Sequence, residues 1–234
     1  MDNHTHAHIE DHLESSDLLR DIVIGMSDGL TVPFALAAGL SGAVSTTHLI
    51  IIAGVAEIAA GAIAMGLGGY LAGKTEIDHY NSELKREYEE VALVPDKEKE
   101  EVRMFFQQLG LSEDVQLQAV EEMTKDKTTW VNFMMKYELG LDKPDPKRAA
   151  KSAFNIGVSY IIGGIIPLSP YFFVSDGLTG LKISAAITLC CLFIFGFFKS
   201  KLTGVNPWAG ALRVTFIGAA AAACAFGIAK LIAG

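Results

Sequence analysis

Long apolar stretches alternate with one long polar segment along this chain. Five stretches are apolar enough, at about 20 residues each, to cross a membrane as helices. The segment between the second and third stretches is rich in charged residues and helix formers. We therefore predict an all-α integral membrane protein with a helical insert between its second and third spans. The predicted parts are a tail (1–20), two spans (21–73), the insert (74–151) and three spans (152–234).

The first two predicted spans contain features that matter for packing in lipid. Both are rich in glycine and alanine, which let helix backbones approach closely in a membrane. In the first span, Pro33 has no N–H to donate to the Gly29 carbonyl, so we expect a break in that helix. In the third span, Pro167 and Pro170 weaken the far end.

The insert is predicted to fold as a compact domain of three helices. Residues 74–92 lack Gly and Pro, and are predicted to continue the second span as a helix that emerges into water. Pro95, followed by acidic residues, is typical of the first turn of a second helix. Gly110 indicates a helix end, and Ser112 is the expected N-cap of the third helix.

Composition and charge agree with this division and exclude some partners. Half of the residues (50%) are hydrophobic and the mean hydropathy is +0.33. The net charge of −8 lies mostly in the tail and in the insert, which makes nucleic acid an improbable partner. Lys and Arg gather in flanks on one side of the predicted spans. We therefore predict that the N-terminus and the insert are cytoplasmic, and that the C-terminus lies on the opposite side.

The N-terminal tail carries alternating histidines, His4, His6, His8 and His12, among acidic residues. Such a pattern can bind borderline metal ions. A mobile, solvated tail is the interpretation that we favour.

Asp28 in the first span and Met65 in the second are predicted at similar depth. Asp28 lies about seven residues, or roughly 10 Å, from the cytoplasmic start of its span, and Met65 about eight residues, or roughly 12 Å, from the cytoplasmic end of its own. A hard carboxylate with a soft thioether suits a borderline divalent ion such as Fe(II) better than Ca(II) or Mg(II). The alternatives are a structural hydrogen bond to Asp28 and simple packing of Met65.

Glu57 is the charged residue of the second span and lies deeper, toward the far half of the membrane. A charge there costs a few kcal/mol unless it is paired, hydrated or protonated. Glu57 is predicted to be a second station on an ion path or the group that returns a proton. A desolvated carboxylate holds a proton until a cation replaces it, which gives a route to metal/proton exchange. The alternative is a neutral Glu hydrogen-bonded within the bundle.

Rows of acidic residues line predicted helix faces in the insert. Glu83, Glu87 and Glu90 share one face at spacing i, i+4, i+7, and Glu98 and Glu101 repeat the pattern on the next helix. Like charges on one face repel, and cations would relieve that repulsion. A solvated acidic face is the alternative. The adjacent pair of methionines beside Glu138 favours metal binding. The candidate ligands are Glu87, Glu90, Glu98, Glu101, Met134, Met135 and Glu138.

Motifs for catalysis are not found. Glu76 and His79 have the Glu-x-x-His spacing of di-iron bundles, but such a centre needs two of these motifs and the chain has one. The sequence contains no Walker loop and no Gly-x-Ser-x-Gly. We predict that the protein is not an enzyme, has no prosthetic group and is not driven by ATP.

Two motifs of the spans, Asp28-Gly-Leu-Thr-Val-Pro33 and Glu57-Ile-Ala-Ala-Gly-Ala-Ile-Ala-Met65-Gly, together with the Glu/Met-rich insert, closely resemble the plant type of the vacuolar iron transporter family. The resemblance covers essentially the whole chain after residue 17. It implies a homodimeric Fe(II)/H⁺ antiporter that moves cytosolic iron into the vacuole. Asp28 and Met65 match positions that line the ion path at the dimer interface, and Glu57 matches an acidic position of that family.

The resemblance also implies that the insert is a cytoplasmic domain that collects metal through the candidate ligands given above. Plant members also move Mn(II), and Zn(II) and Co(II) are further candidate ions. The predicted partners are divalent metal ions, protons, membrane lipid and a second copy of the chain, with the first spans at the two-fold centre. The alternative is a membrane-anchored metal-binding or sensing protein. An anchor has no use for a buried carboxylate such as Asp28 beside Pro33.

Overall fold

The computed structural model describes residues 12–233, and the elements within this range are all helical, as predicted. Residues 1–11, with His4, His6 and His8 of the predicted tail, lie outside the described residues. In chain order the elements are α1 (His12–Ala43), α2 (Thr47–Leu93), α3 (Pro95–Gln108), α4 (Glu113–Met123), α5 (Lys127–Phe133), the π-helix η1 (Met134–Glu138), α6 (Arg148–Leu168), the 3₁₀ helix η2 (Ser169–Phe172), α7 (Gly177–Leu202) and α8 (Pro207–Ala233).

Five segments are long and apolar enough to cross a membrane, which confirms the predicted number of spans. They are Asp17–Ala43 of α1, Thr47–Leu93, Arg148–Phe172, Gly177–Leu202 and Pro207–Ala233. The third candidate combines α6 with η2, because the helix changes to 3₁₀ geometry directly after Pro167 and Leu168. The proline-rich end of this span is therefore irregular, as its sequence indicates.

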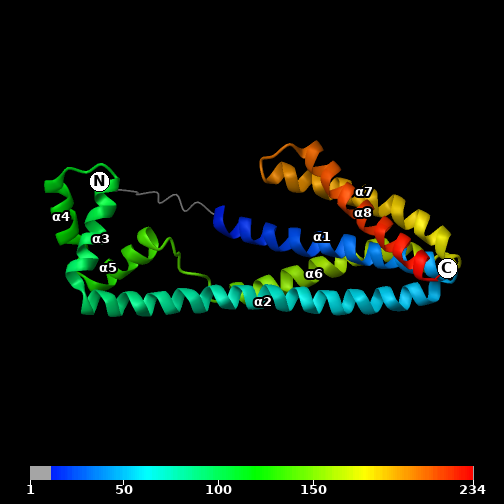
Figure 1. Ribbon diagram of the computed structural model, residues 1–234, viewed down its shortest axis with the longest axis horizontal. Helices are drawn as coiled ribbons and strands as arrows, with labels where there is room; N and C mark the ends of the chain where they lie inside the picture. Colours follow the sequence, from blue (N-terminus) through cyan, green and yellow to red (C-terminus); the bar gives the residue numbers. More distant parts are fainter. Residues whose placement is uncertain (1–11, 234) are drawn as a thin grey trace, which may run out of the picture. The chain divides into compact units, whose positions relative to one another are not determined.

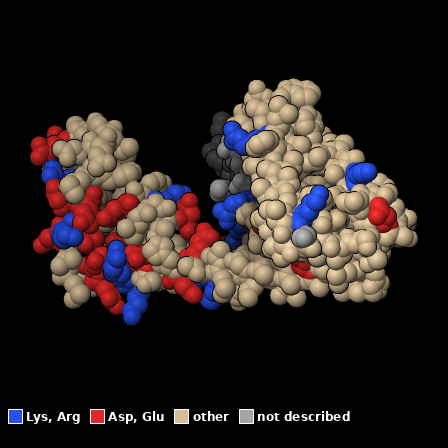
Figure 2. Space-filling view, turned by 45° about the vertical axis from the view of Figure 1, so that its right-hand side comes forward, with Lys and Arg blue, Asp and Glu red and all other residues tan. Residues whose placement is uncertain are grey.

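The chain divides into two compact units. The first, which we call the membrane unit, comprises the chain up to Tyr70 and from Ala150 onward, and the second, the insert, comprises Leu71–Ala149. Within the membrane unit, α1 packs against α7 and α8, which also pack against each other (Figure 1). Figure 2 shows acidic and basic side chains crowded over the insert, whereas the visible face of the membrane unit is mostly uncharged. This contrast agrees with lipid around one unit and water around the other.

Helix α1 differs from its prediction at two points. It begins at His12, well before the expected start near Asp21, because the intervening residues include no Gly or Pro to stop a helix. It also continues through Pro33 without interruption, so the predicted break is wrong. Pro33 still deprives the Gly29 carbonyl of its usual N–H partner, but packing against neighbouring helices maintains helical geometry on both sides.

Glycines bring α1 into close contact with α6. A Cβ added at Gly25 would lie 2.3 Å from the carbonyl oxygen of Ile156, and one at Gly29 would lie 2.3 Å from that of Tyr160. No real side chain tolerates such distances, so these two positions require glycine for the observed approach. The consequence is that Tyr160 is placed directly beside the turn of α1 that carries Asp28.

The first half of the insert follows its prediction. Helix α2 runs from the membrane unit into the insert as one helix of 47 residues, and α3 begins at Pro95. Gly110 adopts a φ of 82°, in the left-handed region that glycine occupies without strain, and so separates α3 from α4. Ser112 stands at the N-cap position of α4, but its side chain makes no capping hydrogen bond. The Gln116 side chain instead donates to the Leu111 carbonyl at 2.7 Å.

The second half of the insert contains more helices than the single one predicted. The chain stops after α4 and restarts at Asp126, whose side chain caps α5 by accepting from the Thr129 backbone N–H at 2.7 Å. Helix α5 then passes directly into η1, where the Leu139 N–H donates to the Met134 carbonyl five residues back. The π-helix changes the direction in which the residues after Phe133 point, and places both Met134 and Met135 in the interior.

One apolar core holds the insert together. It joins α2, α3, α5 and η1 through the buried residues Tyr80, Val91, Val102, Trp130, Val131, Phe133, Met134 and Met135. This core brings the end of α2 against the start of α3. The acidic faces of the two helices therefore meet.

Candidate metal centre and intramembrane carboxylates

Three carboxylates from two helices converge in the insert. Glu87 and Glu90 project from α2 and Glu98 from α3, and one oxygen of each lies within 4.8 Å of the others. We call these three residues, with Glu101 and Glu138 beside them, the acidic cluster. Glu87 and Glu98 are 2% and 1% exposed, which is unusual for glutamate. The alternative prediction, a solvated acidic face, does not describe these two buried side chains.

Glu87 and Glu98 share a side-chain hydrogen bond, but each has a second carboxylate oxygen without a partner in the described part of the chain. Glu87 Oε1 and Glu98 Oε2 are buried and have no hydrogen-bond partner among the described residues. An unsatisfied buried oxygen of this kind costs roughly 1–3 kcal/mol, and more when the group is charged. A cation with oxygen ligands would remove this cost for both side chains at once. The donor set of carboxylates therefore fits a divalent metal ion.

The crowding of like charges changes the proton affinity of the acidic cluster. Desolvation, followed by the charges of Glu138, Glu98 and Glu90, raises the pKa of Glu87 to about 7. Desolvation, followed by Glu101 and Glu98, raises the pKa of Glu138 to about 6. Burial also raises the pKa of Glu98. Near neutral pH, a proton and a metal ion therefore compete for the same oxygens.

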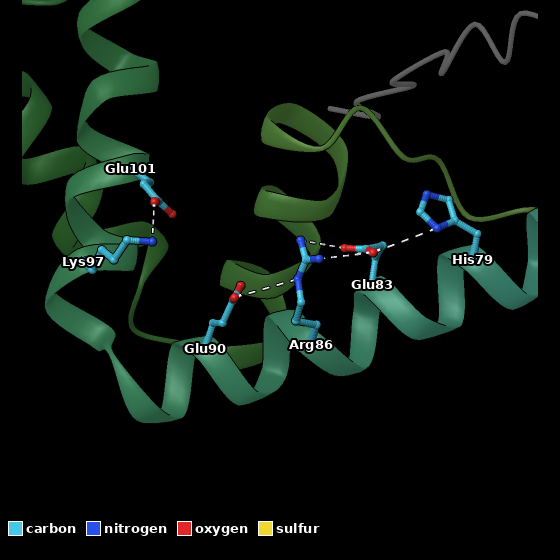
Figure 3. Close-up of polar contacts among 6 residues, drawn as sticks. All are labelled: His79, Glu83, Arg86, Glu90, Lys97 and Glu101. Carbon is cyan, nitrogen blue, oxygen red and sulfur yellow. Dashed lines mark hydrogen bonds and ion pairs between the residues drawn. The ribbon is translucent and has the colours of Figure 1, made fainter.

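Two basic side chains accompany the glutamates (Figure 3). Lys97 Nζ lies 3.1 Å from Glu101 Oε1, across one turn of α3. Arg86 lies 2.8 Å from Glu83 and 3.8 Å from Glu90 on α2. Of the predicted row on α2, Glu83 thus pairs with Arg86 and, at 4.0 Å, with His79, and does not join the acidic cluster.

The structure places the predicted methionine ligands in the apolar core of the insert. Met134 and Met135 are both almost completely buried among Trp130, Phe133 and Val102. Glu138, at the end of the same π-helix, acts electrostatically together with Glu98 and Glu101. The contacts described for the two sulfurs are packing contacts, so their role as metal ligands stays a prediction. A buried thioether at this edge of the core would add a soft ligand to an otherwise hard site.

The membrane unit contains a second group of polar residues around Tyr160. The Tyr160 hydroxyl donates a hydrogen bond to Glu57 Oε1. A Cβ at Gly61 would lie 2.4 Å from this hydroxyl, so the phenol occupies the space that the missing side chain leaves. Asp28 and Glu57 both act electrostatically on the Tyr160 phenol. Tyr160 therefore contacts Glu57 and lies within electrostatic range of Asp28.

Glu57 has one oxygen that is not used. Glu57 Oε2 is buried and without a hydrogen-bond partner in the described part of the chain. The same side chain lines a pocket of about 500 Å³ together with Thr31 and other α1 residues and with small residues of α8, among them Ala221 and Ala225. A carboxylate that lines an intramembrane pocket is a candidate station for a cation or a proton.

Asp28 and Met65, predicted at equal depth, are both partly buried. Met65 lies between Gly61 and Gly69 along α2, and both glycines contact α6, at Tyr160 and Ile156 respectively. Met65 therefore lies on the stretch of α2 that packs alongside α6. A shared metal site of Asp28 and Met65 stays a prediction.

Sequence reasoning missed Tyr160, Lys97, Arg86 and Asp21. Asp21 is 1% exposed and accepts hydrogen bonds from Ser152 at 3.0 Å and Asn155 at 3.4 Å, which join α1 to α6. A signal did exist for Tyr160, because it is a polar aromatic residue inside a span without charges. For Lys97, the i, i+4 spacing to Glu101 in the sequence is typical of an ion pair along a helix.

Comparisons with known proteins give one consistent result. A model described as "VIT family" matches residues 19–230. The chain is 49% identical to Vacuolar iron transporter 1 of Oryza sativa subsp. japonica, over 97% of this chain and 90% of that protein. It is 50% identical to Vacuolar iron transporter 1 of Arabidopsis thaliana, over 99% of this chain and 91% of that protein. It is 39% identical to Protein CCC1 of Saccharomyces cerevisiae, over 92% of this chain and 69% of that protein.

Proposed function

Because this chain belongs to the VIT family, we propose that it carries ferrous iron from the cytosol into the vacuole in exchange for protons. Its relatives are named as transporters, and the chain is not an enzyme. The observation that carries the proposal is Glu57, a partly buried intramembrane carboxylate that lines a pocket, accepts a hydrogen bond from Tyr160 and has its second oxygen buried without a partner among the described residues.

The membrane step uses Asp28, Met65 and Glu57. Asp28 and Met65 supply a hard and a soft ligand, a combination that suits Fe(II). Glu57 then receives either the metal or a proton. Because one carboxylate inside a membrane is stable when neutralised once, arrival of a cation expels the proton and departure of the cation recovers it. Tyr160 keeps Glu57 oriented in both states, since its hydroxyl is a neutral donor.

The insert collects metal on the cytoplasmic side. Supporting this role are the buried oxygens of Glu87 and Glu98 and the charge that Glu90 and Glu101 add beside them. Binding neutralises repulsion within the acidic cluster and concentrates dilute metal ions. Carboxylate-rich sites also accept Mn(II), Zn(II) and Co(II), so we propose that the insert restricts the choice of metal only weakly.

Two chains form the working unit in this proposal. Five spans enclose little interior, and a two-fold dimer with α1 at its centre would build a path between two copies. The basic residues that flank the spans support a cytoplasmic N-terminus and insert, and a lumenal C-terminus.

The rival function is a membrane-anchored metal-binding or sensing protein. The acidic cluster fits either function equally well. What favours transport is the membrane unit, because a carboxylate at Glu57 costs stability that an anchor has no reason to lose. Transport assays therefore decide between the two.

The test is Fe(II) uptake by the full chain in sealed proteoliposomes with a proton gradient. The parent should accumulate Fe(II), and Asp28→Ala should abolish uptake. Asp17→Ala is the matched control, since Asp17 lies on the same helix but pairs with Arg20 at its polar end. Uptake by Asp28→Ala equal to that of the parent would end the intramembrane-site proposal. Parallel runs with Mn(II), Zn(II) and Ca(II) give the order of selectivity.

A further inference from the structure

Lys97 acts on several members of the acidic cluster. Its ammonium pairs with Glu101 at 3.1 Å (Figure 3). The hydrogen bond and charge of Glu101, followed by the charges of Glu98 and Glu90, raise the pKa of Lys97. Conversely, Lys97 opposes the rise in the pKa of Glu98 and of Glu138. One ammonium group is thus coupled to carboxylates from α2, α3 and η1.

Arg86, the other basic neighbour, is bound differently. Two of its guanidinium nitrogens contact Glu83, at 2.8 and 3.4 Å, and its third contact reaches Glu90 at 3.8 Å. Because Glu83 lies outside the acidic cluster, Arg86 keeps a strong partner whatever happens to Glu90. Lys97 has its closest contact with a member of the cluster itself.

We propose that Lys97 is a built-in competitor of the metal ion, which pairs with the acidic cluster and leaves it when a divalent cation binds. This inference rests on the proposed metal-collecting role of the insert. A dication beside Glu98 and Glu101 would repel the ammonium and draw Glu101 toward itself. Lys97 can leave easily, since its side chain is 68% exposed and a flexible stem carries its single charged group into water.

The competition lowers affinity without removing a ligand. Each binding event has to break the Lys97–Glu101 pair, and each release event forms it again. An acidic cluster without this lysine would hold its metal longer. Lys97 is therefore a positioning residue that tunes how readily the insert gives up its ion, and not a ligand.

The chain offers a matched control for a test of this competition. Lys85 pairs with Glu89 at the same i, i+4 spacing, at 3.8 Å, on an exposed part of α2 in the same unit. Glu89 is not a member of the acidic cluster. Lys85→Met and Lys97→Met remove the same charge from the same kind of pair. A difference between them therefore reports on the position of the charge.

The experiment titrates the purified full chain in detergent with Zn(II), and with Fe(II) under anaerobic conditions. Lys97→Met should bind either ion roughly three- to tenfold more tightly than the parent, by loss of a nearby repelling charge at a partly screened site. Lys97→Arg and Lys85→Met should bind as the parent does. Equal or weaker binding by Lys97→Met, or the same gain in Lys85→Met, would overturn the inference.

A second variant separates this inference from the proposed function. Glu98→Gln should lose most of its affinity for Zn(II) if the acidic cluster binds metal. Parent-like binding by Glu98→Gln would remove the proposed role of the insert and the Lys97 inference with it. Lost binding in Glu98→Gln with no gain in Lys97→Met would overturn the Lys97 inference alone.

Lysine footprinting tests displacement directly in the parent chain. An amine-acylating reagent, read out by mass spectrometry, should modify Lys97 several-fold faster after saturation with Zn(II), because the pair with Glu101 no longer protects it. Modification of Lys85 should not change. An unchanged Lys97 rate on saturation would show that the pair survives metal binding and would contradict the proposal.

Discussion

The membrane unit and the insert both bury a carboxylate oxygen without a partner, but the surroundings differ. In the insert, Glu87 lies among other carboxylates, with cationic side chains at the edge. In the membrane unit, Glu57 is held by one neutral donor, the Tyr160 hydroxyl. A crowded group of like charges gains most from a dication, whereas a single carboxylate is neutralised once and then gives the ion up. From this difference we propose that the insert binds metal strongly and that the membrane unit passes it on.

The largest expected effect is on Fe(II) uptake, when the carboxylate of the membrane unit is replaced and the insert is left intact. Glu57→Gln should reduce Fe(II) uptake roughly a hundredfold or more, because a neutral amide exchanges neither a metal nor a proton. Binding of Zn(II) to the insert should not change. Uptake by proteoliposomes and calorimetric titration of the same preparation give both values.

The reciprocal substitution is Glu98→Gln in the insert. Affinity for Zn(II) should fall at least about 10–100-fold, the loss that mutation of even an outer-shell partner of a metal site typically causes. Uptake should persist at saturating Fe(II) and decline only at low Fe(II). If Glu57→Gln and Glu98→Gln had the same effect on Fe(II) uptake and on Zn(II) affinity, the proposal of separate roles for the two regions would be wrong.

The next effect is the pH dependence of binding by the insert. Because the pKa values of Glu87 and Glu138 are raised to about 7 and about 6, metal has to displace protons below neutral pH. Affinity for Zn(II) should fall roughly tenfold per pH unit between pH 7 and 6, and more steeply below pH 6. Glu87→Gln should flatten the upper part of this profile. A flat profile in the parent would contradict the crowded-carboxylate description.

Without metal, the stability of the fold should fall as pH rises, whereas the affinity for Zn(II) rises with pH. Glu87 binds its proton more tightly when folded than when unfolded, so its contribution is present below about pH 4.5 and is lost as pH rises toward 7. Raising the pH from 5 to 8 should therefore lower the free energy of unfolding by about 1–3 kcal/mol. The difference between parent and Glu87→Gln in thermal unfolding isolates this contribution. A parent more stable at pH 8 would refute it.

The smallest expected effect concerns the neutral donor in the membrane unit. Tyr160→Phe removes the hydrogen bond to Glu57 but keeps the ring that fills the space beside Gly61. Uptake of Fe(II) should fall roughly fivefold, equivalent to about 1 kcal/mol for one hydrogen bond, while the amount of folded protein is retained. No change in uptake would show that Tyr160 only packs. Complete loss would show a role in proton transfer that orientation alone does not explain.

Features set by neighbouring residues were predictable from the sequence. The start of α3 at Pro95 and the end marked by Gly110 depend on backbone restrictions of single residues. The five spans follow from apolar length alone. The course of α1 through Pro33 was not predictable, because contacts with α6 and other helices override a local tendency to break.

The composition of the two sites depended on contacts that spacing does not reveal. A helix face joins Glu83, Glu87 and Glu90, but the turn at Val94 decides that Glu87 and Glu90, and not Glu83, meet Glu98. Similarly, the pair of Tyr160 and Glu57 spans 103 positions in sequence and needs the packing of α6 on α2. Sequence patterns provided the candidates, and tertiary contacts selected among them.

The most direct test of metal/proton exchange records iron and pH in the same vesicles. Proteoliposomes with an acidic interior would contain the full chain, an Fe(II) chelator and a pH-sensitive dye. The account predicts that the internal pH rises as Fe(II) enters, and that both changes stop when a proton ionophore collapses the gradient or when Asp28 is replaced by Ala. Entry of Fe(II) without a change in internal pH, or at an unchanged rate after collapse of the gradient, would contradict it.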